Sequence, residues 1–185
     1  MVTLEKIKTM QKLKNLYTDL IQNPITNAGV CVGLFDENDI FNWKLTMIGP
    51  QDSPYRDGLF YLKIKFPENY PKQAPEVCFI SPIYHVNVNP CLPKGKGGDP
   101  LGHICISDLN WWKETQDLRQ LLVDIFALFY LGNPDSPYGT GRAEELRNNK
   151  SLYDKKVAYF TKKYADSNAP EAEEWTTDWD FTYTG

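Results

Sequence analysis

Two stretches in the first half of the chain alternate hydrophobic and polar residues with a period of two. Successive side chains of a β-strand point to opposite faces of a sheet, so this pattern predicts strands with one buried face. The apolar positions of the two stretches are Phe41, Trp43, Leu45, Met47, Phe60, Leu62, Ile64 and Phe66. Shorter apolar stretches at residues 30–34 and 76–80 complete a predicted antiparallel meander of about four strands.

Helical spacing marks both ends of the chain and one segment between them. Residues 4–21 are predicted to form a first helix, which ends at Asn23-Pro24 because the residue before a proline disfavours the helical conformation. Apolar residues from Leu118 to Phe129 predict a well-buried helix, and residues 152–164 a final amphipathic helix. A helix, a sheet, an irregular segment and further helices indicate an α+β domain, for which we expect the bounds 1–165.

Residues 80–109 show almost no periodicity. This stretch holds both histidines and two of the four cysteines, and residues 90–102 are rich in glycine and proline. Long irregular segments inside a compact domain are usually functional or disordered. We therefore expect the chemistry of this protein to lie here.

Composition excludes several classes of protein. The chain has 185 residues, of which 42% are hydrophobic, and a formal net charge of −4. This apolar fraction argues against disorder, and the negative charge argues against a nucleic-acid partner. No stretch approaches the roughly 20 apolar residues of a membrane span, so no membrane partner is expected. Four cysteines are too few for a disulfide scaffold, which favours the reducing cytoplasm or nucleus.

Charge is concentrated at the two ends of the chain. The first 14 residues contain a single acid, Glu5, and four lysines, which are Lys6, Lys8, Lys12 and Lys14. Such a basic helix indicates an acidic partner or merely a soluble surface. Residues 166–185 contain six acids and no base, and we expect them to form a flexible acidic tail outside the domain.

Cys105 is the candidate nucleophile. It lies between Ile104 and Ile106 in the irregular segment, where an exposed and deprotonated thiol could attack a carbonyl. From these neighbours alone, a small buried hydrophobe is the favoured interpretation of this residue. Cys31 and Cys78 lie in predicted strands, where burial is favoured, and Cys91 lies in the Pro/Gly-rich loop.

Two other chemistries fit the sequence less well. A zinc site would use ligand-type residues whose separations of six, twelve and two positions do not match structural zinc sites. These residues are His85, Cys91, His103 and Cys105. A cysteine protease would need a histidine and an acid in triad geometry, and proximity in sequence does not establish one.

An ordered set of segments resembles the core of ubiquitin-conjugating enzymes, the E2 family. The segments are residues 49–81 (GPQDSPYRDGLFYLKIKFPENYPKQAPEVCFIS), YHVN at 84–87, LGHICIS at 101–107, Trp112 and NPDSPY at 133–138. The resemblance extends from about residue 4 to residue 165. It implies the E2 fold, with an N-terminal helix, a four-stranded antiparallel meander, a long active-site segment, a buried central helix and C-terminal helices.

The resemblance implies an acyl transferase with a cysteine thioester intermediate. Cys105 aligns with the cysteine that accepts ubiquitin, or a ubiquitin-like protein, from an ATP-dependent E1 enzyme and passes it to a lysine or an E3 ligase. Asn87 aligns with the asparagine of the His-Pro-Asn motif, which donates to an oxyanion or braces the active-site loop. Ser136 falls at the gate position, and His85 aligns with the motif's histidine, for which a structural role is expected. No cofactor or metal is implied.

Partners also follow from the resemblance. E2 enzymes meet an acidic domain of E1 through the first helix, which implies that Lys6, Lys8, Lys12 and Lys14 contact E1. An E3 ligase or a substrate protein would approach near Cys105, where the inserted loop carries Lys94 and Lys96. These two lysines are therefore candidates for contact with a substrate or an E3.

Several positions depart from the family pattern. Val86 replaces the proline of the motif, and residues 90–101 lengthen the chain between Asn87 and Cys105. Lys72 stands where many relatives carry an apolar residue for docking E3 ligases. The alternative function is a non-catalytic E2-like module that binds ubiquitin or another E2, although such modules characteristically lose the cysteine.

Overall fold

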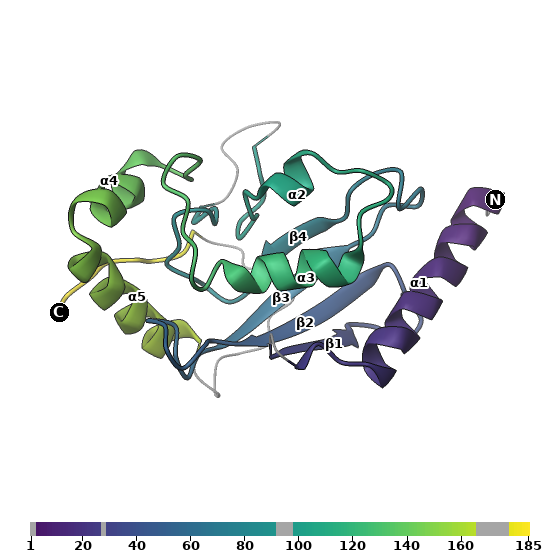
Figure 1. The fold of residues 1–185 in the computed structure, drawn as a ribbon, viewed down its shortest axis with the longest axis horizontal. Coiled ribbons are helices and arrows are strands. Elements are labelled where there is room, and N and C mark those ends of the chain that lie inside the picture. The colour runs from purple at the N-terminus through teal and green to yellow at the C-terminus, as the bar shows by residue number, and fades with distance from the viewer. Residues whose placement is uncertain (1–2, 27–28, 92–97, 166–177) are drawn as a thin grey trace.

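A computed structural model describes residues 3–26, 29–91, 98–165 and 178–185. Helix α1 (Leu4–Gln22) precedes the strands β1 (Val30–Leu34), β2 (Asn42–Ile48), β3 (Leu59–Lys65) and β4 (Glu76–Phe79). A short helix, α2 (Ser107–Asn110), is followed by α3 (Leu118–Ala127), α4 (Thr140–Asn148) and α5 (Lys150–Tyr164). The α+β architecture predicted from the sequence is confirmed (Figure 1).

The four strands form one antiparallel sheet in the order β1-β2-β3-β4. The register pairs Leu45 with Leu62 and Trp43 with Ile64, and all four of these side chains are fully buried. The alternating residues of the sequence therefore occupy one face of the sheet. Figure 1 shows α3 lying across the sheet, with α1 at one end of the molecule and α4 and α5 at the other.

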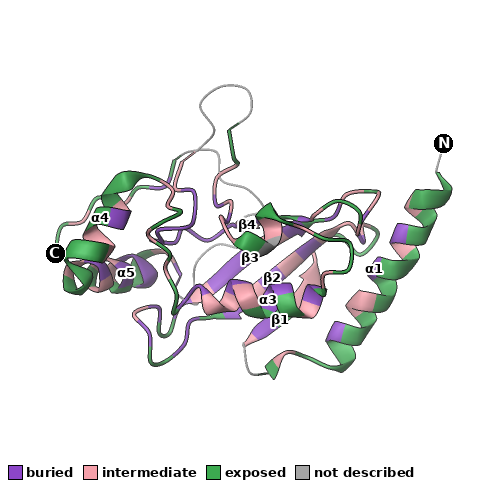
Figure 2. Ribbon diagram, turned by 45° about the horizontal axis from the view of Figure 1, so that its top comes forward, coloured by how far each residue is buried: buried purple, intermediate pink, exposed green. Residues whose placement is uncertain are grey.

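Helix α1 is capped at its N-terminus and is largely exposed. The Thr3 side chain accepts a hydrogen bond from the Lys6 backbone N–H at 3.1 Å and caps the helix. The helix buries only Thr9, Leu13 and Leu20, so most of its surface is exposed (Figure 2). Among the described residues, no helix is both long and apolar enough to cross a bilayer.

Residues 79–89 are all buried, although their sequence shows no regular pattern. Buried backbone groups must find hydrogen-bond partners, and here side chains from distant elements supply them. The Tyr55 hydroxyl donates to the Tyr84 carbonyl at 3.0 Å, and the Val86 N–H donates to the Tyr153 hydroxyl at 3.0 Å. The segment is therefore part of the core rather than a surface loop.

Gly102 permits the close approach between this segment and the sheet. Its φ of +76° lies in the left-handed region, and a Cβ atom here would lie 1.9 Å from the Phe79 carbonyl oxygen. The Phe79 N–H donates to the Gly102 carbonyl at 2.8 Å, while an isolated bridge joins Cys78 to His103. The chain leading to Cys105 is thus attached to the edge of β4.

The helical region holds two elements that the periodicity did not predict. Helix α2 is a single short turn that begins two residues after Cys105, at Ser107. Helix α4 buries only Ala143, so it leaves no hydrophobic stripe in the sequence. The central helix ends at Ala127, two residues before the predicted Phe129, although Phe129 is itself buried.

The end of the chain differs from the flexible tail that its charge suggested. Residues 178–185 pack against the domain along α5, with Trp179 only 7% exposed. Charge alone did not predict this, because the aromatic residues between the acids provide apolar surface to bury. Residues 166–177 lie outside the described part of the chain.

Candidate active site

Cys105 is held in place by the backbone of the irregular segment. Its N–H donates to the Asn87 carbonyl at 2.9 Å, and an isolated bridge joins the preceding Ile104 to Val88. Ile104 is fully buried, whereas Cys105 is half-buried. An apolar anchor followed by a partly accessible thiol argues against a sealed core cysteine.

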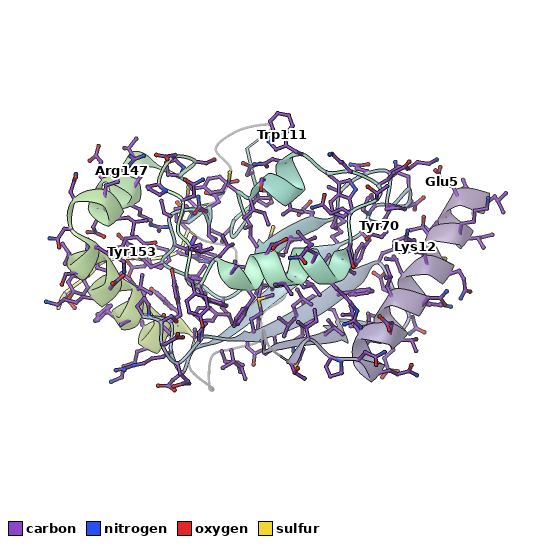
Figure 3. All side chains as sticks on the ribbon, in the orientation of Figure 1. Glu5, Lys12, Tyr70, Trp111, Arg147 and Tyr153 are labelled. Carbon is purple, nitrogen blue, oxygen red and sulfur yellow. The ribbon has the colours of Figure 1, made fainter. Side chains whose placement is uncertain are left out.

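Two polar side chains converge on the sulfur of Cys105. The Ser136 Oγ lies 3.2 Å from Cys105 Sγ, and the Asn110 Nδ2 donates to Sγ at 3.5 Å. Together with Asn87, these residues line a hollow of about 310 Å³. Trp111, 79% exposed, also lines it and projects outward from the end of α2 (Figure 3).

Sequence reasoning missed Asn110. The residue lies five positions after Cys105, about one and a half turns on, at the end of α2. A search for amide side chains within one or two turns of the nucleophile would have found it.

Asn87 is buried below the hollow, with 1% of its surface exposed. Its Nδ2 donates to the Asn133 carbonyl and to the Ser136 carbonyl, both at 2.8 Å. Its Oδ1 accepts from the Asn133 N–H at 2.7 Å. An amide group has two N–H donors, and both are engaged by the backbone of the loop that carries Ser136. This geometry is that of a brace.

His85 supports the same segment from inside the core. The Asn87 N–H donates to its Nδ1 at 3.0 Å, which makes Nδ1 an acceptor. Its Nε2 lies 3.0 Å from the Leu128 carbonyl, so Nε2 carries the proton. Burial lowers the pKa of His85 to about 4, which keeps this ring neutral at physiological pH. The ring thus links two backbones and does not face Cys105.

The contacts of Val86 explain why position 86 holds valine rather than the proline of the motif. Its N–H donates to the Tyr153 hydroxyl and its carbonyl accepts from the Tyr138 N–H at 2.8 Å. A proline would have no N–H to give to Tyr153. The side chain of Val86 is fully buried, so valine also contributes to the core.

A second polar network joins the end of the inserted loop to the loop of Ser136. The Tyr138 hydroxyl donates to Asp99 at 2.8 Å and lies 2.6 Å from the Nδ1 of His103. Burial, and then the hydrogen bond to Asp99, raise the pKa of Tyr138 well above its ordinary value. The sequence singled out only His103 of these three residues, and only as a possible metal ligand.

The basic residues of α1 lie on a different part of the molecule. Lys8, Lys12 and Lys14 are exposed, whereas Lys6 is half-buried and forms an ion pair with Glu68 at 2.6 Å. The Lys12 ammonium lies 5.8 Å from the centre of the Tyr70 ring (Figure 3). Lys94 and Lys96 lie outside the described residues.

The expected E3-docking position is polar. The Lys72 ammonium forms an ion pair with Glu5 at 2.6 Å, and both side chains are largely exposed. Their hydrogen bond raises the pKa of Lys72. The common apolar contact is therefore replaced by a solvated ion pair, which contributes little to stability.

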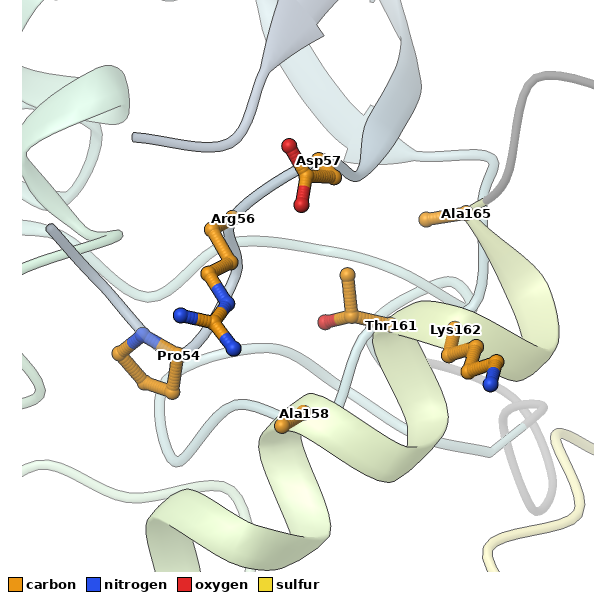
Figure 4. A pocket seen from close by; sticks show the side chains of 7 residues that line it. All are labelled: Pro54, Arg56, Asp57, Ala158, Thr161, Lys162 and Ala165. Atoms are coloured by element: carbon orange, nitrogen blue, oxygen red, sulfur yellow. The ribbon is translucent and has the colours of Figure 1, made fainter. Parts of the chain in front are cut away.

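Other parts of the structure do not add to the site. A hollow of about 430 Å³ lies between the turn at residues 54–57 and α5, where Arg56, Asp57 and Lys162 line it (Figure 4). It contains none of the residues predicted for chemistry. Among the described residues, no three His, Cys, Asp or Glu side chains are grouped closely enough to hold a metal.

Comparison with known proteins finds relatives that match most of the chain, including the residues around Cys105. The family model described as "Ubiquitin-conjugating enzyme" matches residues 12–161. Ubiquitin-conjugating enzyme E2 13 of Arabidopsis thaliana is 34% identical over 157 residues, which cover 82% of this chain and 92% of that protein. Ubiquitin-conjugating enzyme E2 14 of Schizosaccharomyces pombe is 34% identical over 159 residues, which cover 85% and 94%. The chain therefore belongs to the ubiquitin-conjugating enzyme (E2) family, as its ordered motifs and its fold indicated.

Proposed function

We propose that Cys105 accepts ubiquitin, or a ubiquitin-like modifier, from an E1 enzyme and transfers it to a lysine or an E3 ligase. The Cys105 thiolate attacks the carbonyl of the E1 thioester, a new thioester forms, and the E1 thiolate leaves. An amine then attacks this thioester, loses a proton and forms an amide, and the Cys105 thiolate leaves. Cysteine suits both steps because it is a strong nucleophile and a competent leaving group.

The observation that carries this proposal is the placement of Cys105 Sγ within reach of Ser136 and Asn110 at an open hollow. A thiol with polar neighbours and solvent access can form an acyl intermediate, whereas a non-catalytic module needs no such arrangement. The family match includes every one of these residues.

Each neighbour has a distinct role in the proposal. The Asn110 amide, near the sulfur and exposed, is free to turn toward an oxyanion at the thioester carbon. The Ser136 hydroxyl orients the incoming amine; a hydroxyl is too weak a base to deprotonate it. Asn87 serves as the brace that holds the Ser136 loop, because its two donors are engaged there.

The partners follow from the family. We propose that the exposed lysines of α1 bind E1, and that a substrate or an E3 approaches the hollow beside Cys105. The polar pair of Lys72 and Glu5 favours an E3 whose docking surface is itself polar. Lys94 and Lys96 remain candidates for contact with that substrate or E3.

Incubation with E1, ATP and a panel of modifiers, followed by non-reducing electrophoresis, tests the proposal. We expect a thiol-sensitive conjugate that Cys105→Ala abolishes and that Cys105→Ser converts into a more stable oxyester. Alanine at Cys31, Cys78 or Cys91 serves as the matched control and leaves charging intact. No charging by any modifier, or charging at Cys91, would contradict the proposal.

A further inference from the structure

The last eight residues contact the backbone segment that carries Asn87. The backbone N–H of Trp179 donates to the Pro90 carbonyl at 3.2 Å, and the Phe181 ring lies 5.4 Å from the ring of Tyr84. In Figure 1 this yellow segment runs past the region between the sheet and α5 to the C-terminus beside α4 and α5. Both ends of the segment 84–90 are thus in contact with the C-terminal residues.

Phe181 is fixed on α5 by its neighbours. Its ring lies 4.9 Å from that of Phe160 and 6.1 Å from that of Tyr164, edge to face in both cases. Asp180, the residue before Phe181, is also held by α5. The Tyr164 hydroxyl donates to the Asp180 carbonyl, and the Lys163 ammonium pairs with the Asp180 carboxylate at 3.4 Å. Such aromatic pairs add to the free energy gained by burial, so this end of the chain has a defined place.

Arg142 connects Phe181 to the active-site segment. Its guanidinium lies 4.6 Å from the centres of the Phe181 and Tyr84 rings. The same guanidinium donates to the His85 carbonyl at 3.0 Å and to the Val88 carbonyl at 3.4 Å. Aromatic faces stabilise a desolvated cation, so the two rings favour the position from which Arg142 holds residues 85–88.

Asn87 lies between these two carbonyls in sequence. Its side chain binds the loop of Ser136, and its own carbonyl accepts the Cys105 N–H. A continuous series of contacts therefore runs from Phe181 through Arg142 and residues 85–88 to both the nucleophile and its neighbour. Proline at position 86 would stiffen this segment, and the chain has valine there.

We propose that Trp179 and Phe181 are positioning residues, which hold segment 84–90 so that Asn87 keeps Ser136 at Cys105. The inference rests on the proposed function, since it concerns the geometry for attack on the thioester. The aromatic residues of the C-terminal region then hold the active-site segment in place.

The first test compares Phe181→Ala with Tyr183→Ala in single-turnover transfer from the charged protein to free lysine. Tyr183 is a matched control because it is also aromatic and packs on α5, with ring centres 5.2 Å from Tyr159 and 6.4 Å from Phe160, whereas Phe181 is the ring that contacts Arg142 and Tyr84. We expect Phe181→Ala to lower the maximal transfer rate roughly fivefold to thirtyfold, with little change in the lysine concentration for half-maximal rate. Phe181→Trp, which keeps an aromatic face, restores most of the rate.

A second test does not depend on thioester chemistry. Amide hydrogen exchange is measured in the uncharged protein for the N–H groups of Val86, Asn87 and Cys105, with Leu62 in β3 as reference for global unfolding. We expect Phe181→Ala to accelerate exchange at the first three positions more than at Leu62, and Tyr183→Ala not to do so.

The outcomes separate the two proposals. If the parental protein is never charged but Phe181→Ala still loosens segment 84–90, the proposed function fails while the clamp stands. If charging is normal and Phe181→Ala leaves both the transfer rate and the local exchange unchanged, the clamp is refuted. A uniform acceleration that includes Leu62, with equal losses in Tyr183→Ala, would also refute it, because the C-terminal residues would then stabilise the whole domain only.

Discussion

Asn87 and Asn133 bind each other reciprocally. The Asn87 amide donates to the Asn133 carbonyl at 2.8 Å, and the Asn133 N–H donates to the Asn87 side-chain oxygen at 2.7 Å. A pair of this kind fixes two chain segments that are 46 positions apart, one beside Cys105 and one carrying Ser136. The side chain of Asn87, which the resemblance made a catalytic candidate, therefore holds these two segments together in the uncharged protein.

Replacing Asn87 tests whether its side chain has this structural role. Asn87→Ala removes three hydrogen bonds, to the Asn133 N–H, the Asn133 carbonyl and the Ser136 carbonyl, and each contributes roughly 0.5–1.5 kcal/mol to the free energy of unfolding. We expect a clear loss of stability in denaturant titration together with slower charging and slower transfer. Asn133→Ala is the control, because the bonds to Asn87 use only the Asn133 backbone. Unchanged stability with loss of transfer alone would instead indicate direct oxyanion stabilisation by Asn87.

Asn110→Ala should separate chemistry from folding. The side chain is exposed and contacts the sulfur at 3.5 Å, so its removal should change the unfolding free energy by no more than about 0.5 kcal/mol. We expect transfer to lysine to slow by roughly tenfold, the equivalent of one hydrogen bond to a developing charge. Rapid-quench measurement of discharge provides the rate. A parental rate would remove Asn110 from the site.

The motif's usual proline should be harmful at position 86. Val86→Pro removes the N–H that binds the Tyr153 hydroxyl, and we expect a loss of roughly 1–3 kcal/mol in unfolding free energy. In a Tyr153→Phe background that bond is already absent, so the same substitution should cost less. A double-mutant cycle by thermal or chemical unfolding measures this coupling. Equal costs in both backgrounds would show that the bond does not matter.

Acid should destabilise the protein through His85. The pKa of this buried ring is lowered from 6.5 to about 4, so between these values unfolding takes up a proton. Above pH 6.5 the neutral His85 ring costs no free energy of unfolding. The free energy of unfolding declines as the pH falls below 6.5, and the decline levels off below pH 4 after a loss of about 3 kcal/mol. The chain has two histidines, so NMR titration of both imidazoles, with His85→Gln to assign them, checks the value directly. A His85 signal that titrates near pH 6.5 would contradict it.

Charge reversal on α1 should slow charging by E1. Lys8, Lys12 and Lys14 are exposed, and exposed charges act mainly on the association rate, which salt screens. We expect their replacement by glutamate to reduce the charging rate at low ionic strength, with the defect shrinking as salt rises. Reversal of the exposed lysines of α5, Lys150, Lys155 and Lys162, changes net charge equally and serves as control. A defect of the same size at every salt concentration would argue against electrostatic recruitment.

Much of the fold follows from local patterns. The alternation from Phe41 to Met47 and from Phe60 to Phe66 predicted two central strands, because one face of each strand is buried and side chains alternate between the two faces. Helix α4 left no such trace, since only Ala143 is buried. Periodicity records which side of an element is buried, and an element with little burial cannot show it.

The sequence by itself determined the sheet, the main helices, the family and the position of Cys105, because these depend on residue type, spacing and order along the chain. Only the tertiary structure decided that Asn87 braces the Ser136 loop, that Asn110 reaches the sulfur, and that Phe181 covers Arg142. Asn110 lies only five positions after Cys105, whereas Asn87 and Phe181 contact residues far from them in the sequence, through a backbone carbonyl or a ring face. Such partners follow no period in the sequence, since they are chosen by which buried groups the folded chain leaves to be satisfied.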